Sequence, residues 1–215
     1  MATRDTAGRA GSRACGQTPG TLPSAARLDS GMNRRTTLVL QAVAVALVAS
    51  LVGLLAWQVL NKEAAAGLVG AVKRGETPAA PPLDLPELDG DGRVSLADYR
   101  GQAVVLNFWA SWCEPCKKEA PMLEEAWRRH GERGLVVLGV NAQDFETDAK
   151  GFVERYGLTY PIAHDGPGSS LGRYGLTGFP ETWWIDREGR LVAYAQGEFT
   201  QDELDANIER ALRQS

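Results

Sequence analysis

The apolar positions along the chain fall into one long run and several short ones. The long run, Leu38 to Leu60, has 23 residues without a charge and is polar only at Gln41, Ser50 and Gln58. As a helix it would extend about 34 Å, which is enough to cross a hydrocarbon core of roughly 30 Å. We therefore expect a transmembrane helix over residues 38–60.

The residues around this run predict its direction and its fate. Arg34 and Arg35 precede it, and the positive-inside rule places them in the cytoplasm, so that the chain after the helix lies outside. A cleaved signal peptide is the alternative, but its apolar region would have only ~7–15 residues before a small-residue cleavage site. Here Asn61-Lys62-Glu63 separates the run from the nearest alanine cluster. These features favour an uncleaved signal anchor.

The segments on either side of the predicted anchor lack apolar periodicity. Residues 1–37 are rich in Ala, Gly, Arg, Ser, Thr and Pro, and we expect a disordered basic segment there. Met32 is an alternative start of translation, which would remove the residues before it, Cys15 included. Residues 61–82 mix alanine, glycine and charges and end in prolines, which predicts a semi-flexible linker that holds the following domain near the membrane.

The short apolar runs from residue 83 onward alternate between strand and helix patterns. Alternating apolar residues on both sides of Asp89-Gly90-Asp91-Gly92 predict a β-hairpin. Continuous apolar runs at 103–109 and 135–140 predict two buried, parallel strands. Further helices are expected near 114–129, 146–156, 169–174 and 201–212, and further strands near 160–163, 181–186 and 191–195. This order predicts an α/β domain over 83–215, with a central mixed sheet covered by helices on both faces.

Charge is divided unevenly along the chain. Residues 1–37 contain six arginines and two aspartates, a net charge of +4, and the remainder carries −8, with 17 Lys and Arg against 25 Asp and Glu. A nucleic-acid-binding protein would carry its basic charge on the folded part. The acidic domain therefore argues against nucleic acid as a partner, and the split indicates that the two parts occupy different compartments.

The candidate chemistry lies where the first buried strand meets a helix. Cys113-Glu114-Pro115-Cys116 opens the helical pattern, and two thiols at this spacing can form a disulfide across one turn. Cys113 would stand at the first turn, where unpaired backbone N–H groups and the helix dipole lower a thiol pKa from ~8.5 into the ~3.5–7.5 range. Cys116 would be more sheltered and would act as the resolving thiol. Pro115 suits a helix start, because the donor it lacks would be unpaired there anyway.

Two other uses of the cysteine pair fit the sequence less well. A structural zinc site needs a second pair of ligands, and neither Cys15 nor the two histidines, His130 and His164, stand at a ligand spacing from the pair. A purely structural disulfide that closes so short a loop would stabilise the fold only weakly. We therefore expect redox exchange, which also gives a Cys-x-x-Cys pair a purpose in an oxidising compartment.

Three groups of residues carry a family resemblance. They are Asp91-Gly92 with Asp98-Tyr99-Arg100-Gly101, the stretch from Asn107 to Pro121 around the cysteine pair, and Gly178-Phe179-Pro180-Glu181-Thr182. Together they resemble the thioredoxin superfamily, and within it the membrane-anchored TlpA-like branch of ResA and CcmG/DsbE type, over about residues 83–212. The resemblance implies a thioredoxin fold with an N-terminal β-hairpin extension, in which Cys113 attacks and Cys116 resolves, without a metal or an organic cofactor.

The same resemblance implies a substrate-binding surface around the dithiol. Pro180 matches a cis-proline that faces the cysteines, and Trp112, Phe179 and Pro180 would contact an extended substrate segment. The sequence alone favours the alternative that Pro180 simply starts an edge strand, and the resemblance reverses this preference. Glu181 resembles the CcmG version of this loop, and it forms either an acidic rim that selects basic partner segments or a plain exposed charge.

An acid beside the resolving cysteine is expected at Glu119. Cytosolic thioredoxins have an aspartate at the strand position of Asn107, which exchanges a proton with the resolving thiol, and an asparagine cannot do this. Glu119 lies three residues after Cys116 on the same helix face, and the ResA-like branch has an active-site acid at this position. Partial burial would raise its pKa and let it exchange a proton with Cys116. The alternative is a solvated glutamate on the helix surface.

Four further residues have expected positions rather than expected functions. Trp183 and Trp184 alternate on a strand, so one is expected in the core and the other outward. His130 follows two arginines at the end of a helix and is expected to be a capping charge. His164 is expected in a loop.

The function that the resemblance implies is that of a membrane-anchored, extracytoplasmic thiol–disulfide oxidoreductase. Its substrates would be disulfide-containing proteins, with apocytochrome c as the leading example, and its electrons would come from a transmembrane donor of CcdA/DsbD type. An oxidase that forms disulfides in secreted proteins would use the same residues in reverse. A copper-binding chaperone would need a different cysteine spacing with a nearby histidine, and a peroxiredoxin would need a Pro-x-x-x-Thr-x-x-Cys pattern, which is absent around the strand end.

Overall fold

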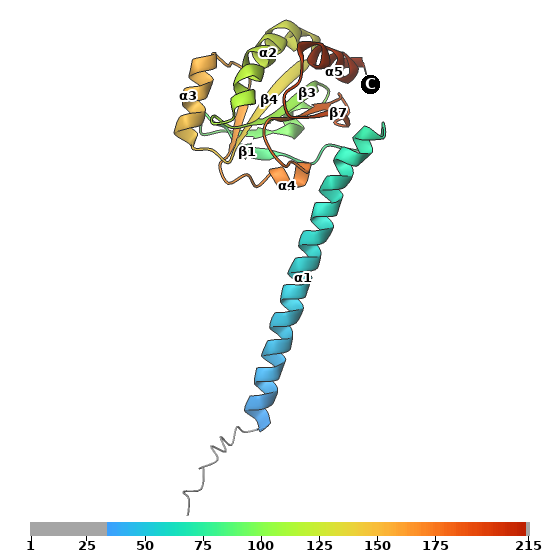
Figure 1. Ribbon diagram of the computed structural model, residues 1–215, viewed down its shortest axis with the longest axis vertical. Helices are drawn as coiled ribbons and strands as arrows, with labels where there is room; N and C mark the ends of the chain where they lie inside the picture. The colour runs from blue at the N-terminus through green and yellow to red at the C-terminus, as the bar shows by residue number, and fades with distance from the viewer. Residues whose placement is uncertain (1–33, 214–215) are drawn as a thin grey trace, which may run out of the picture. The chain divides into compact units, whose positions relative to one another are not determined.

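The structure is a computed structural model that describes residues 34–213, apart from the side chains at 34–36 and 58–66. Cys15 and the predicted disordered segment up to residue 33 lie outside the described residues. The described chain begins with helix α1 (Arg34–Lys73) (Figure 1). Its stretch Thr37–Trp57 has a mean hydropathy of 2.6, and none of it is buried. By length and composition, this helix is able to cross a membrane.

Helix α1 is longer than the sequence pattern predicts. It continues past Leu60 to Lys73, through the first half of the segment that was expected to be a semi-flexible linker. The alanines at 64–66 favour a helix, and no glycine or proline lies between Leu60 and Gly67. The helix ends ahead of Gly75, whose φ of +84° is easily adopted only by glycine.

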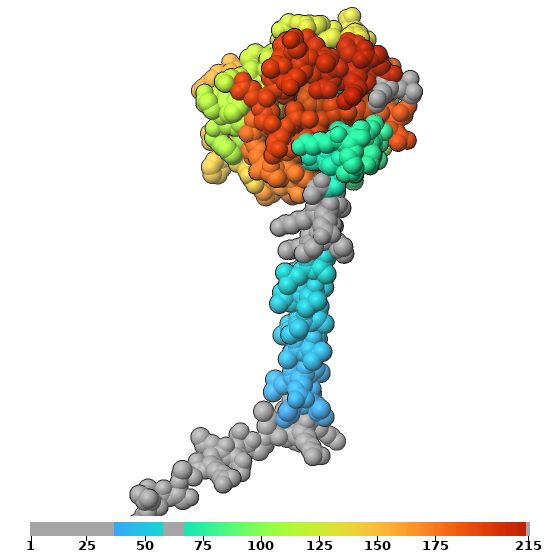
Figure 2. All heavy atoms as spheres, turned by 45° about the vertical axis from the view of Figure 1, so that its right-hand side comes forward, coloured from blue at the N-terminus to red at the C-terminus, as the bar shows by residue number. Residues whose placement is uncertain are grey.

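The second half of the predicted linker is attached to the domain. The Leu191 N–H donates to the Pro78 carbonyl at 2.8 Å, and the Ala80 N–H donates to the Gly189 carbonyl at 2.9 Å. Figure 2 shows this green segment against the orange and red later part of the chain. The extended chain at 78–80 therefore pairs with the start of a strand and differs in this respect from a free tether.

Five strands form the central mixed sheet, in the order β5-β4-β3-β6-β7. β3 (Ala103–Trp109) lies in the middle, parallel to β4 (Leu135–Ala142) and antiparallel to β6 (Glu181–Ile185). β5 (Ile162–Asp165) pairs with β4 at one edge and β7 (Leu191–Gln196) pairs with β6 at the other. Every residue of β3 and β4 is buried, as their continuous apolar runs predict.

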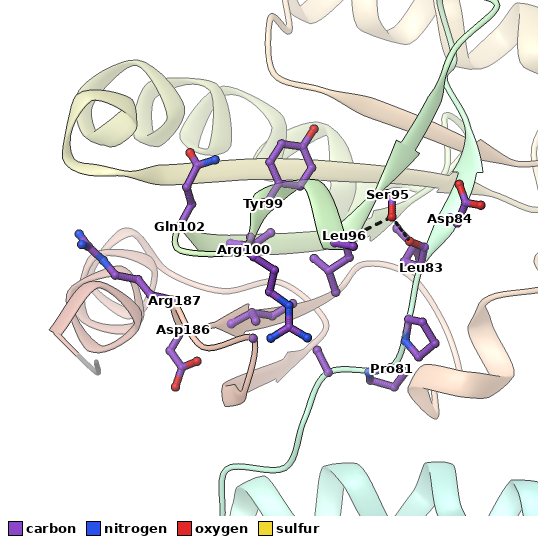
Figure 3. Close-up of a pocket in the computed structure, with 16 residues that line it drawn as sticks. Pro81, Leu83, Asp84, Ser95, Leu96, Tyr99, Arg100, Gln102, Asp186 and Arg187 are labelled. Atoms are coloured by element: carbon purple, nitrogen blue, oxygen red, sulfur yellow. Dashed lines mark hydrogen bonds between the residues drawn. The ribbon is translucent and has the colours of Figure 1, made fainter.

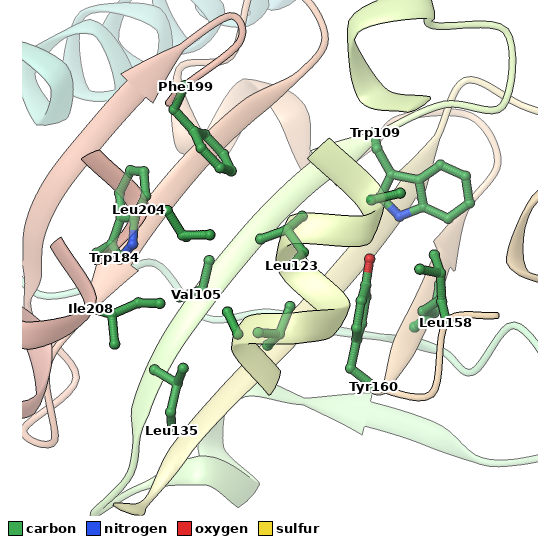
Figure 4. Close-up of a cluster of buried hydrophobic side chains, with 14 of the residues drawn as sticks. Val105, Trp109, Leu123, Leu135, Leu158, Tyr160, Trp184, Phe199, Leu204 and Ile208 are labelled. Atoms are coloured by element: carbon green, nitrogen blue, oxygen red, sulfur yellow. The ribbon is translucent and has the colours of Figure 1, made fainter. Parts of the chain in front are cut away.

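Three helices cover one face of the sheet. They are α2 (Glu114–His130), α3 (Glu146–Tyr156) and α5 (Gln201–Arg213). Their apolar sides pack with residues of the sheet in one core cluster, part of which Figure 4 shows around Val105 and Leu123. Because the chain steps from β3 to β4 to β5 in one direction, right-handed crossovers place α2 and α3 on the same face.

The other face is covered mainly by the N-terminal hairpin. Strands β1 (Asp84–Pro86) and β2 (Arg93–Ser95) pair antiparallel and contribute to a second core cluster with the short helix α4 (Leu171–Tyr174). The structure thus confirms the predicted thioredoxin fold with its hairpin extension. The cover is less symmetric than expected, since the longer helices of the domain lie on one face.

The prediction for the two adjacent tryptophans is wrong. Trp183 and Trp184 are both 0% exposed. They do point to opposite faces, since Trp183 belongs to the cluster under the hairpin and Trp184 to the cluster under the three helices. Both are buried because both faces of this strand are covered.

The predictions for the two histidines are also wrong. His164 lies on strand β5, and its Nδ1 atom is 2.9 Å from Asn141 Oδ1. His130 is buried at the end of α2, and burial together with the neighbouring cations Arg133 and Arg129 lowers its pKa. His130 is therefore neutral at neutral pH and does not act as a capping charge.

Candidate active site

The two cysteines lie at the junction of β3 and α2. Cys113 is the N-cap residue of α2, and its Sγ accepts the Cys116 backbone N–H at 3.3 Å. The pair forms a disulfide and is almost equally buried, with Cys113 4% and Cys116 3% exposed. Pro115 stands in the first turn, where a missing backbone donor costs nothing. The expected difference in shelter is absent in the disulfide form, so position at the helix start distinguishes the two sulfurs.

A carboxylate on the neighbouring loop fixes the turn that leads to Cys113. Asp144 follows β4 and accepts the Ser111 backbone N–H at 2.6 Å, the Ser111 hydroxyl at 2.9 Å and the Asn141 amide at 2.8 Å. Asp144 was not among the site residues predicted from the sequence. Its only signal was its place just after a buried parallel strand, at the sheet edge where β3 also ends.

Trp112 lies between two loops at the dithiol. Its indole N–H donates to the Gln143 carbonyl at 3.1 Å, and its ring meets the edge of Phe179 at a centroid distance of 5.6 Å. Phe179 precedes Pro180 across a cis peptide bond. Trp112 is 59% exposed, Phe179 is half-buried and Pro180 is buried. The predicted substrate-contact residues Trp112 and Phe179 thus form a continuous aromatic surface next to Cys113.

Glu181 differs from both expectations for it, because its side chain is only 1% exposed. Its Oε1 accepts the backbone N–H groups of Thr177 and Gly178, each at 2.9 Å. Its Oε2 accepts the Tyr194 hydroxyl at 2.5 Å. Glu181 therefore forms neither an acidic rim nor an exposed charge. It fixes the loop that carries the cis-proline.

This role predicts a difference between two substitutions of Glu181. Glu181→Ala leaves two backbone donors and the Tyr194 hydroxyl unpaired, at about 1–3 kcal/mol each, so the free energy of unfolding should fall by several kcal/mol. Glu181→Gln keeps an acceptor for the loop and should lose less. Urea unfolding of the two variants, with the exposed Glu188→Ala as control, measures the difference. Equal losses in Glu181→Ala and Glu188→Ala would contradict the assignment.

Glu119 is a buried acid in the first turns of α2. It is 1% exposed, and its carboxylate accepts the Phe199 backbone N–H at 3.1 Å and the Asn107 amide at 3.3 Å. Burial raises the pKa of Glu119 to about 8, although both hydrogen bonds act in the opposite direction. The alternative of a solvated surface glutamate is excluded by this burial. Asn107 also donates to Thr182 Oγ1 at 2.9 Å, so it connects the acid to the residue after Glu181.

Metal-ligand geometry is not found in the described part of the chain. Among the side chains that the structure describes, no group of three or more His, Cys, Asp or Glu could hold a metal ion. His164, the histidine considered for a copper site, is paired with Asn141.

One hollow in the domain lies away from the dithiol. It has a volume of about 250 Å³, and its lining includes Leu83, Tyr99, Gln102 and Arg187 (Figure 3). Gln102 directly precedes β3, whereas the cysteines follow the other end of that strand. The redox chemistry therefore belongs to the surface around Trp112 and not to this hollow.

A Cys-x-x-Cys disulfide at a helix start, beside a cis-proline on a β5-β4-β3-β6-β7 sheet, defines a protein of the thioredoxin class. The family model of the AhpC/TSA family matches residues 77–194. The chain therefore belongs to the AhpC/TSA family, whose fold is thioredoxin-like.

Known proteins narrow this assignment. The thiol–disulfide oxidoreductase ResA of Geobacillus thermodenitrificans is 32% identical over 83% of this chain and 98% of its own length. ResA of Bacillus thuringiensis is 34% identical over 61% of this chain and 75% of its own. A DsbE-like thiol:disulfide interchange protein of Chlorobium tepidum has a similar structure, with a TM-score of 0.60 and 31% identity over 63% of this chain and 96% of that chain. The protein is a thiol–disulfide oxidoreductase of ResA/DsbE type.

Proposed function

We propose that the protein is anchored in the membrane by α1 and reduces disulfides of partner proteins outside the cytoplasm. The anchoring is supported by the exposed apolar stretch Thr37–Trp57 and by the two arginines before it. An acidic domain on the far side of the membrane is consistent with the charge of −8 after residue 37, where 17 Lys and Arg stand against 25 Asp and Glu.

The proposed reaction is a two-step thiol–disulfide exchange. The Cys113 thiolate attacks one sulfur of the substrate disulfide, which forms a mixed disulfide and releases the other substrate sulfur as a thiolate that takes up a proton. Cys116 then loses its proton and attacks Cys113 Sγ. This forms the Cys113–Cys116 disulfide and releases the second substrate thiol. Two electrons pass from the dithiol to the substrate, and no metal or organic cofactor takes part.

The observation that carries the exchange chemistry is the Cys113–Cys116 disulfide at the start of α2, and the buried acid Glu119 on the same helix supports it. Its pKa of about 8 means that Glu119 is mostly protonated at neutral pH in the disulfide form. This is the state expected after a carboxylate has accepted the proton of Cys116 during the second step. We assign Glu119 the role of proton acceptor in the reductive direction and of proton donor when the disulfide is reduced again.

The proposed partners are drawn from the family and from the proposed location. A dithiol outside the cytoplasm needs a supply of electrons, so we propose a transmembrane donor of CcdA/DsbD type. The proposed substrates are disulfide-containing proteins, with the haem-attachment cysteines of apocytochrome c as the first to be tested. The aromatic surface of Trp112 and Phe179 supports a polypeptide substrate, because thiol exchange with a small disulfide needs no such binding surface.

The reduction potential of the Cys113–Cys116 couple tests the direction. The full-length chain in detergent is equilibrated with glutathione or dithiothreitol buffers, and the fraction of free thiol is measured by alkylation. We expect a value near the reducing end of the known range, about −270 mV. A value near about −120 mV would make the disulfide the reactive form, and the protein would then be an oxidase of secreted proteins.

A further inference from the structure

Phe145 is exposed without a structural reason. Among the described side chains from residue 67 to 213, only Trp112 and Phe145 are large, hydrophobic and exposed, and Phe145 is the more exposed, at 77%. Single exposed apolar residues are common on protein surfaces and need no explanation by themselves. Phe145 is unusual for two reasons. It is the N-cap residue of α3, and it lies only two residues after Gln143, which contacts Trp112 beside the dithiol.

Phe145 occupies a position that favours a small polar residue. It is the N-cap of α3, and its side chain makes no capping hydrogen bond there. Serine, threonine, aspartate or asparagine at an N-cap pairs with an unpaired backbone N–H of the first turn, and losing such a cap costs about 1 kcal/mol. The exposed ring regains nothing by packing. Phe145 therefore lowers the stability of the helix start, and exceptions of this kind are expected at functional sites.

The loop that carries Phe145 is held against the active-site turn. The Phe145 backbone N–H donates to Asp144 Oδ1 at 2.9 Å, and the same carboxylate binds the backbone N–H and hydroxyl of Ser111. Gln143 has a φ of 53°, which is unusual for a residue with a side chain, and its carbonyl accepts the Trp112 indole N–H. The backbone of Phe145 is thus held in place two residues after Gln143, which contacts Trp112 directly.

The sheet order places this loop on one side of the dithiol and the cis-proline loop on the other. β4 and β6 are the two neighbours of β3. The loop 143–145 follows the end of β4, and the loop 177–180 precedes β6, which runs antiparallel to β3. Both loops therefore flank the end of β3, where the cysteines begin. Trp112 contacts both of them, through Gln143 and through Phe179.

We propose that Phe145 is a specificity-determining contact of the thiol–disulfide exchange, which binds an apolar side chain of the substrate segment next to its disulfide. The occupant is the substrate because the Phe145 loop is continuous with the surface around Cys113 that every disulfide substrate must meet. The expected preference is for apolar substrate residues. The Phe145 ring is 77% exposed, and covering it with an apolar side chain removes the most apolar surface from water. The proposal rests on the exchange activity and not on its direction or on the membrane anchor.

The test uses Phe145→Ser in the full-length chain in detergent. The substrates are two disulfide peptides that differ at one residue beside the cysteine, leucine in one and serine in the other, and a small disulfide, hydroxyethyl disulfide. For the leucine peptide, we expect kcat/KM to fall roughly tenfold, mainly through KM. For the serine peptide and the small disulfide, we expect less than about a twofold change. Phe145→Leu should keep most of the preference, and Glu154→Ala on the outer side of α3 is the matched control.

A second readout separates this role from a structural one. Serine at the N-cap should raise the midpoint of thermal unfolding by about 2–4 °C, so the variant should be more stable and at the same time less selective. Equal rates of wild type and variant on the leucine peptide would overturn the proposal. A uniform loss of kcat/KM on all three substrates would overturn the proposal as well. So would a loss of self-association without any change in the peptide rates, because Phe145 would then contact a second copy of the chain.

Discussion

A Cys116→Ser variant is expected to stop halfway through the exchange and to remain joined to its substrate by a disulfide at Cys113. Cys113 can still attack, because its thiolate is stabilised by the N-terminus of α2 and not by the thiol of Cys116. A serine hydroxyl cannot displace the substrate sulfur, so the second step fails. Turnover should fall to the uncatalysed level, and a dithiothreitol-sensitive adduct should appear on non-reducing gels.

The experiment is cleanest with Cys15 also changed to serine, which leaves a single thiol in the chain. Cys113→Ser in the same background is the matched control and should form no adduct. Burial does not distinguish the two sulfurs, since they are 4% and 3% exposed, so the control decides the assignment. An adduct through Cys116 with none through Cys113 would mean that the two cysteines have the opposite roles. Mass spectrometry of the trapped adducts from cell membranes then identifies the substrates.

The parts of the fold that local pattern determines were predictable from the sequence. The strand 103–109 and the helix that begins at the cysteine pair have bounds close to those expected, because apolar runs and helical spacing depend on neighbours in the chain. The burial of Trp183 was not predictable. It depends on what covers the second face of the sheet, and that cover comes from a hairpin about ninety residues earlier in the sequence.

The same distinction applies to the candidate site, where positions within one helix were predictable and contacts between distant segments were not. Cys113 caps the helix that holds Cys116 and Glu119, so their places along this helix followed from spacing alone. Glu181 was placed in the wrong environment because its partners, Thr177 and Tyr194, come from a loop and another strand, and no local signal indicates that a charged residue will be enclosed. A loop residue such as Asp144 acts through contacts with another loop, here with Ser111, and no local pattern in the sequence indicates such contacts.

The second large effect is expected from Glu119→Gln, in the dependence of the exchange rate on pH. If Glu119 accepts the proton of Cys116, glutamine removes a positioned acid–base group, and the second step should slow about 10²–10⁴-fold. The wild-type rate should change with an inflection near the pKa of Glu119, about 8, and the variant should lack it. Stopped-flow measurement of mixed-disulfide resolution between about pH 6 and 10 separates this step from the first attack.

The same substitution should change stability in a direction that the pKa fixes. The folded disulfide form holds a proton on Glu119 up to about pH 8, whereas the unfolded chain releases it near the ordinary value of 4.5. The free energy of unfolding of the wild type therefore falls as the pH rises from 4.5 to about 8, because the unfolded state binds fewer protons in this window. Glu119→Gln stays neutral and should be more stable than the wild type at pH 9, by on the order of a few kcal/mol.

Glu124→Gln is the matched control for both measurements, because Glu124 is a second buried carboxylate on the same helix. Burial alone would raise its pKa, but hydrogen bonds from Thr159 and an ion pair with Arg128 lower the pKa below its ordinary value. Glu124 is ionised at neutral pH, so its substitution should lower stability there and leave the inflection near pH 8 in place. An inflection that survives in Glu119→Gln would show that another group carries the proton. A simultaneous gain in stability at high pH would then leave Glu119 as a buried acid without a part in the exchange.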